Sequence, residues 1–437
     1  MIPDKSTKTL LLVYLLSLPF LAVWEFPVVG TKIQPPELFF LVLLVWVLIK
    51  KPFKLGPLLP LDFLILLNLG AFALSALINR GNYLEIVGLV YLFSIYLFFS
   101  RFFWQRDHIK WTIKGLTYSA GLATLLGVIG FFAATIFHYD NAWSWSTDRY
   151  YPYLGYIGRA RAWTTNPNML FSFLAMVVLL QLGIWLKSRK INIEVKILML
   201  LSAVGLVLTF SKMILAFFIA AMWVWHHSQK VKKRMVSIIL FGMALFLFFT
   251  LQFGTHFLVT KADQTPWEEL QRNAYSDAKP IITIHGHHLL RTNYSINKKA
   301  ACQAGTTNFP FGVGPGKFND FVAQQKQIGA YPSFFTNYDP HSTYFGAFAE
   351  IGLLGLITVL GLFTGVYFAW RKACKLYATA SPWEQGFILG IGGCFILIAI
   401  EAISTDVLNF RHYWVVLGLL GMLLRNIIAT KSAHQKP

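Results

Sequence analysis

The sequence is poor in charged residues and in cysteine. Only 13% of its 437 residues are Asp, Glu, Lys or Arg, whereas a soluble chain needs roughly 25% to cover its surface. A water-soluble enzyme is therefore excluded. The three cysteines, Cys302, Cys374 and Cys394, lie far apart and form no C-x-x-C pair, so neither a disulfide framework nor a zinc site is indicated.

Acidic residues are scarcer than basic ones. The chain has 19 Asp and Glu against 38 Lys and Arg, a net charge of +19, which in a soluble domain would suggest a nucleic-acid partner. Most basic residues stand at alternate junctions between hydrophobic stretches, which the positive-inside rule assigns to the cytoplasm. Both termini are therefore predicted to be cytoplasmic, and no nucleic acid is expected. These junctions lie at Lys5 and Lys8, 50–54, 101–114, 187–196, 230–234, 371–375 and the C-terminus.

Long hydrophobic stretches dominate the rest of the sequence. Hydrophobic residues make up 56% of the chain, its mean hydropathy is +0.55, and many stretches approach the ~20 residues that cross a bilayer. We predict an all-α, polytopic integral membrane protein with about twelve transmembrane helices. The segment 197–227 is too long for one span and is interrupted at Thr209–Lys212, so two short helices are expected to meet there.

The predicted spans divide the chain into three parts. Residues 1–254 are expected to contain helices 1–9, with a smaller extracytoplasmic segment near 136–167. Residues 255–342 are expected to form a large extracytoplasmic loop domain between helices 9 and 10, and 343–437 to contain helices 10–12 and the C-terminus. Both extracytoplasmic segments mix Trp, Tyr, His, Arg and Gly, which favours a folded, hydrated site at the membrane surface.

His341 follows Pro340 where the chain becomes hydrophobic again. We expect it in the first turn of a membrane helix, at the extracytoplasmic water boundary. Because histidine titrates near neutrality, a side chain there can take a proton from a hydroxyl nucleophile. From position alone, an interfacial histidine without a chemical role is the alternative. Glu350 lies nine residues later, about 180° around an ideal helix, so we expect it to form a structural hydrogen bond instead of contacting His341.

Two other features suggest an anionic ligand. Gly312, Gly314 and Gly316 alternate along a short segment, which permits close backbone approach to a phosphate, although an ordinary Gly-Pro turn is the alternative. The segment is not a Walker A loop, because no Ser or Thr follows Lys317. The second feature is a set of extracytoplasmic or interfacial cationic side chains. Each one alone is consistent with a solvated surface charge, whereas the set together favours binding of a pyrophosphate. These are Arg159, Arg161, Lys212 and Arg291.

A metal site is not indicated. The spacing of His285, His287 and His288 matches no HExxH helix, and the extracytoplasmic segments contain no D-x-D-like acidic pair. The remaining candidates for metal ligands are acidic, and we interpret them as surface residues of the loop: Asp263, Glu268 and Glu269. We therefore expect no required divalent ion and no cofactor.

The order of these motifs resembles the O-antigen ligase and O-antigen polymerase superfamily. The histidine-Ser pair stands before an E-x-G-x-x-G helix segment, the glycine segment precedes it, and Arg161 with Asn166-Pro167-Asn168 is similar to the family's Arg-to-NPN element. Lys212 stands where the family commonly has Arg after Ser, and Arg291 where it has a loop arginine. The resemblance extends from about residue 155 to 356.

The resemblance implies a GT-C-type fold and an active site at the periplasmic face of the bacterial inner membrane. It implies transfer of glycan from undecaprenyl pyrophosphate to lipid A–core oligosaccharide by a metal-independent, inverting O-antigen ligase. A polymerase of undecaprenyl-linked repeat units, a protein O-oligosaccharyltransferase and a transporter of lipid-linked sugars are the alternatives. By this resemblance His341 and Arg291 are catalytic, pyrophosphate is bound by Arg159, Arg161, Lys212 and Arg291, and Glu350 and Asn168 support them. Lys212 offers a point charge where an arginine would offer a bidentate fork.

Overall fold

Helices make up most of the computed structural model. It describes residues 5–21, 26–28, 31–50, 58–102, 106–137, 145–151, 155–228, 234–261, 281–331 and 339–434. Its helices are α1 Lys5–Ser17, α2 Pro35–Lys50, α3 Pro60–Asn79, α4 Tyr83–Phe102, α5 Arg106–Phe137, α6 Pro167–Ser188, α7 Ile193–Leu208, α8 Ile214–Ser228, α9 Arg234–His256, α11 Asn293–Thr307, α12 Phe318–Gln327, α13 Thr343–Leu376, α14 Pro382–Glu401 and α15 Arg411–His434.

Six of these helices are long and apolar enough to cross a membrane. They comprise Pro60–Asn79, Tyr83–Arg101, Asp107–Ile136, Pro167–Ser188, Thr343–Leu376 and Pro382–Glu401. Shorter apolar helices occupy Ile214–Ser228 and Ile238–Gly254. The chain is therefore a mostly helical, polytopic membrane protein. These six spans are those of the described part of the chain, and the number of about twelve stays a prediction.

Short strands correct the prediction of an all-α chain. β1 Phe26–Val28 pairs with β2 Thr31–Ile33, and β3 Trp145–Tyr151 pairs with β4 Gly155–Ala160, both antiparallel. A three-stranded sheet has the order β5-β7-β6, formed by Phe257–Lys261, His287–Arg291 and Ile282–Ile284. Such short strands in polar segments do not show the hydropathy signal on which the prediction rested. The described part of 255–342 thus contains a sheet and two helices, α11 and α12.

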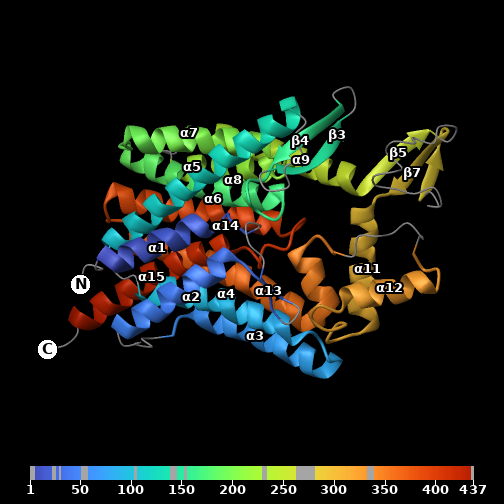
Figure 1. Ribbon diagram of the computed structural model, residues 1–437, viewed down its shortest axis with the longest axis horizontal. Coiled ribbons are helices and arrows are strands. Elements are labelled where there is room, and N and C mark those ends of the chain that lie inside the picture. Colours follow the sequence, from blue (N-terminus) through green and yellow to red (C-terminus); the bar gives the residue numbers. More distant parts are fainter. Residues whose placement is uncertain are drawn as a thin grey trace.

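Most helices pack side by side along the long axis of the molecule, whereas α11 runs across it at one end (Figure 1). Glycines set the closest approach: a Cβ atom on Gly183 of α6 would lie 2.4 Å from the carbonyl oxygen of Gly386 in α14. The helix break predicted at Thr209–Lys212 is present, between α7 and α8. In Figure 1, β5, β7, α11 and α12 lie at one end of the bundle, and the start of α1 and the end of α15 lie toward the other.

Candidate functional site

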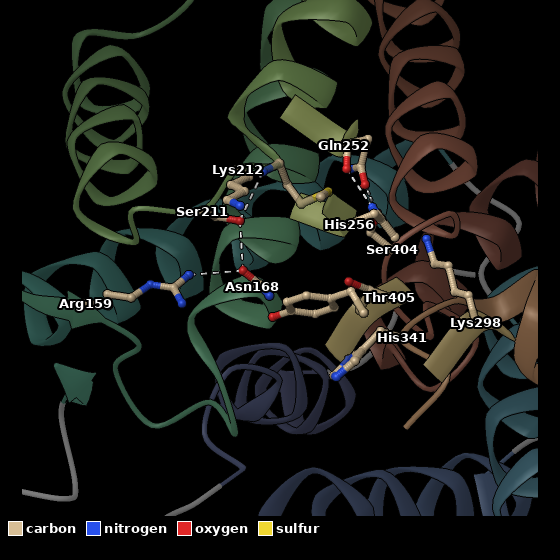
Figure 2. Close-up of a pocket in the computed structure, with 12 residues that line it drawn as sticks. Arg159, Asn168, Ser211, Lys212, Gln252, His256, Lys298, His341, Ser404 and Thr405 are labelled. Atoms are coloured by element: carbon tan, nitrogen blue, oxygen red, sulfur yellow. Dashed lines mark hydrogen bonds between the residues drawn. The ribbon is translucent and has the colours of Figure 1, made fainter. Parts of the chain in front are cut away.

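A polar pocket of about 80 Å³ lies where the bundle meets the segment that contains α11. Four residues predicted from the sequence line it together: Arg159, Asn168, Lys212 and His341 (Figure 2). They come from three separate parts of the chain, since Arg159 and Asn168 are only nine residues apart, so the fold produces this convergence. The other lining residues are Ser211, Met213, Gln252, His256, Tyr294, Lys298, Ser404 and Thr405.

His341 is fixed by the residues on either side of it. Its backbone is left-handed, with φ 49°, and its N–H donates to Asp339 Oδ1 over 2.8 Å. The next residue, Ser342, caps α13: its hydroxyl accepts from the N–H of Phe345 and donates to the carbonyl of Ala402 over 2.8 Å. A left-handed non-glycine residue costs about 1 kcal/mol or more and persists only where the surroundings impose it. The start of α13 therefore holds the imidazole in place.

The surroundings of His341 favour its neutral form. Burial lowers the pKa of His341, the Asp339 carboxylate raises it, and the Lys298 ammonium lowers it further. Asp339 Oδ2 lies 3.7 Å from His341 Nδ1, and the Tyr294 ring centroid lies 4.9 Å from that of the imidazole. A neutral imidazole can accept a proton, which is the property that a general base needs.

Asn168 connects the elements that carry two of the cations. Its Oδ1 accepts from Arg159 Nη2 over 3.2 Å and from the Ser211 hydroxyl over 2.9 Å. Arg159 Nε also donates to the carbonyl of Thr209 over 2.8 Å. These bonds join β4, the first turn of α6 and the break between α7 and α8 (Figure 2). The break therefore has a fixed geometry, which places Lys212 at the pocket.

Sequence reasoning missed the residues that α9 and α11 contribute. His256 Nδ1 lies 2.6 Å from the carbonyl of Gln252, whose side chain accepts from the Ser404 hydroxyl. Burial lowers the pKa of His256, and burial lowers the pKa of Lys298 to about 8. Tyr294 and Lys298 are four residues apart, the spacing of one helical face. That signal was present in the sequence, but no helix was expected there.

Two predicted cations do not line this pocket. Arg291 ends β7, where it pairs with Phe257 of β5. Arg161 lies two residues beyond Arg159, and its Nε has no hydrogen-bond partner among the described residues. Burial lowers the pKa of Arg161. Lys298, seven residues beyond Arg291, occupies the place at the pocket that the sequence assigned to the loop arginine.

The glycine segment packs against α13 and not around this pocket. The N–H groups of Val313 and Gly314 donate to the carbonyls of Ala349 and Glu350, over 2.9 and 2.8 Å. A Cβ atom on Gly312 would lie 2.6 Å from the carbonyl oxygen of Ala349. The glycines thus permit backbone-to-backbone packing. Gly352, at the centre of this contact, has φ 74° and interrupts the helical backbone of α13.

Glu350 takes part in the same contact. Its carboxylate accepts hydrogen bonds from the backbone N–H groups of Gly316 and Phe318, and its carbonyl accepts from the Ser75 hydroxyl over 2.9 Å. These contacts join α3, the glycine segment and α13. They are the contacts that a structural role requires, and Glu350 does not line the pocket of His341.

A second cavity, of about 420 Å³, lies on the other side of the segment 339–342. All the charged side chains that line it are acidic: Glu85, Asp339, Glu350 and Asp406. Burial, and then the charge of Asp339, raise the pKa of Asp406 to about 6. Within the described part of the chain, no three His, Cys, Asp or Glu side chains lie close enough together to hold a metal ion. The sequence candidates Asp263, Glu268 and Glu269 lie outside that part.

The fold and the pocket define a polytopic membrane protein with a basic, histidine-containing site at one end of its bundle. The O-antigen ligase family model matches residues 197–360, the segment that carries Lys212, His256, Lys298 and His341. This match confirms the resemblance seen in the motifs and supports an enzyme of the O-antigen ligase or polymerase type. No curated protein matches the chain.

Proposed function

We propose that this protein is an O-antigen ligase. It transfers O-antigen glycan from undecaprenyl pyrophosphate to lipid A–core oligosaccharide and requires neither a metal ion nor a cofactor. The observation that carries the proposal is one pocket in which His341, with a lowered pKa, lies with Arg159, Lys212 and Lys298. A base beside several cations suits a reaction that deprotonates a hydroxyl and releases a pyrophosphate.

In the proposed reaction, an acceptor hydroxyl oxygen attacks the anomeric carbon of the donor sugar. The bond from that carbon to the pyrophosphate oxygen breaks, and its electron pair leaves with undecaprenyl pyrophosphate. The hydroxyl proton passes to the imidazole of His341. Arg159, Lys212 and Lys298 stabilise the negative charge that develops on the leaving oxygen. Attack from the side opposite the leaving group inverts the anomeric configuration.

We further propose the topology that the basic junctions indicate. The chain lies in the bacterial inner membrane with both termini in the cytoplasm, so the pocket opens to the periplasm. Lys5 and Lys8 of α1 belong to the cytoplasmic junctions, and α1 begins toward the bundle end that lies away from α11 (Figure 1). Residues 255–342 then form the periplasmic domain between two transmembrane helices, within a GT-C-type arrangement.

The test supplies a defined undecaprenyl-pyrophosphate oligosaccharide and lipid A–core to the purified protein. Capped core with inverted anomeric configuration is the expected product, and exhaustive chelation leaves its rate unchanged. A longer lipid-linked glycan with unmodified core would identify a polymerase instead. A glycosylated protein hydroxyl would identify a protein O-oligosaccharyltransferase. Movement of the lipid-linked sugar across vesicles without any new glycosidic bond would identify a transporter.

A further inference from the structure

A third cavity, of about 300 Å³, lies between α5, α6, α7 and α14. One helix, α6, connects it to the pocket of His341: Asn168 lines that pocket and Gln181 lines this cavity. At 1.5 Å per residue, the two positions are ~20 Å apart along the helix. The cavity therefore lies toward the opposite end of the bundle, where α5 begins and α6 ends.

The charge at this cavity is strongly unbalanced. Three lysines line it, Lys110, Lys114 and Lys190, against one carboxylate, Glu194. The Tyr118 hydroxyl donates to that carboxylate. Lys110 Nζ lies 3.7 Å from Oδ1 of the exposed Asp107, which does not line the cavity. Among the described ion pairs, none involves Lys114 or Lys190. The arrangement therefore favours an anionic ligand.

Local contacts hold the lysines and the wall of the cavity in position. Lys114 Nζ lies over the rings of Trp111 and Tyr118, 5.9 and 5.3 Å from their centroids, and such contacts orient an ammonium group without neutralising it. The buried Gln181 donates from Nε2 to the Thr117 hydroxyl over 2.7 Å. A hydrogen-bonded polar pair thus forms part of the wall between two membrane-spanning helices.

The cavity continues into an apolar surface. Its lining includes Ile113, Ile184 and Leu198. Beyond it, α5 exposes Leu122 and Leu125, and α7 exposes Ile197 and Leu200, which is 70% exposed. Leu122 and Leu125 lie four and seven residues beyond Tyr118, which places them on the same helical face as that lining residue. A ligand with an anionic head and hydrocarbon chains matches both parts of this surface.

We infer that this cavity binds the phosphate headgroup of an anionic glycerophospholipid. The phosphate contacts Lys110, Lys114 and Lys190, and the acyl chains lie along the exposed faces of α5 and α7. Basic pockets between transmembrane helices recognise lipid headgroups by this combination of charge and depth. The site is separate from the proposed active site, so its test does not depend on transfer activity.

The test measures lipid binding to the delipidated protein by native mass spectrometry, with phosphatidylglycerol, phosphatidylcholine and inorganic phosphate as probes. Phosphatidylglycerol is expected to bind and phosphatidylcholine to bind much more weakly. Since each lysine near a membrane surface contributes ~1 kcal/mol, Lys114→Gln/Lys190→Gln should weaken phosphatidylglycerol binding on the order of 30-fold. Lys190→Gln alone, a change in an exposed loop, should weaken it about fivefold.

A matched control removes two lysines that do not line the cavity. Lys372→Gln/Lys375→Gln makes the same change of charge at exposed positions of α13, which contributes no residue to the cavity, and phosphatidylglycerol binding should remain within about twofold of the original, since surface charges away from the ligand contribute little. Equal losses in both double variants would overturn the inference, as would equal binding of the two lipids. Displacement of phosphatidylglycerol by inorganic phosphate at equal concentration would assign the site to free phosphate and overturn the lipid assignment.

Discussion

The two cavities beside His341 share one short segment and carry opposite charge. His341 lines a pocket with three cations, whereas Asp339 and Ser342 line a cavity whose charged side chains are all acidic. His341 has a left-handed backbone, with φ 49°, and Ser342 has an extended one, with φ −168° and ψ 132°. The change of backbone conformation at His341 accompanies the division between two electrostatic environments within four residues.

The difference explains how a single imidazole can serve as a base beside a bound anion. The cations on one side favour an anionic ligand, and burial together with the Lys298 ammonium favours the neutral imidazole by lowering the pKa of His341. Asp339, on the other side, stabilises the proton once His341 has accepted it. Neither environment alone provides both properties. The following predictions test this division of roles, beginning with the largest expected effect.

Removal of the imidazole should have the largest effect on activity. General base catalysis contributes ~10²–10⁴-fold, so His341→Asn should lower kcat by about that factor. Asn tolerates the left-handed backbone of this position, and the fold should therefore persist. Transfer is measured with the lipid-linked donor and lipid A–core. His287→Asn, at an exposed position of β7, is the matched control, and full activity of His341→Asn would remove the proposed base.

Loss of one pocket cation should have the next largest effect. Lys298→Met should lower kcat/KM by ~10²-fold, because a charge that stabilises a leaving group contributes about that much. Lys299→Met removes the neighbouring exposed lysine and should leave transfer unchanged. Lys212→Arg should retain activity, since it keeps the positive charge. Comparable losses in Lys298→Met and Lys299→Met would show that overall charge matters and the pocket does not.

Arg291→Met sharpens the same comparison. Arg291 does not line the pocket, so its replacement should change kcat/KM by less than about fivefold, within the range of surface substitutions. A loss as large as that of Lys298→Met would return the catalytic role to Arg291. The variants are compared at equal amounts of folded protein, determined by gel filtration.

The backbone contact that positions the start of α13 predicts a loss of stability. A Cβ atom on Gly352 would lie 2.0 Å from the carbonyl oxygen of Pro310, and the residue has φ 74°. Gly352→Ala should therefore destabilise the fold by ~1–3 kcal/mol, seen as a lower Tm in detergent. Gly361→Ala on the same helix meets its nearest atom only at 3.9 Å and is the control. Equal Tm values would show that the contact does not hold the segment between the two cavities.

How far the sequence predicts this molecule depends on the range of the interactions involved. Hydropathy is local, and it predicted the helical class and the break at Thr209–Lys212. Proline and polar residues before an apolar stretch predicted His341 in the first turn of a helix, whereas the structure places it one residue before the N-cap of α13, with a left-handed backbone. By contrast, His256 and Lys298 reach the pocket only because distant elements converge, and no local pattern encodes that convergence. The glycine segment was compatible with close approach either to a phosphate or to another part of the backbone. Only its packing against α13 distinguishes these two possibilities.

The smallest predicted effect is a shift of the pH profile, which tests the acidic side of the comparison. Asp339 raises the pKa of His341, whereas burial and Lys298 lower it. Asp339→Asn should therefore lower the pKa of the imidazole. Because the neutral imidazole is the active form, the rise of kcat/KM with pH should shift to lower pH, while the plateau changes little. Asp320→Asn removes an exposed carboxylate paired with Lys317 and should leave the profile in place. A kcat/KM that falls instead of rising with pH through this pKa would mean that His341 acts in its protonated form, and the imidazole would then be an acid and not the proposed base.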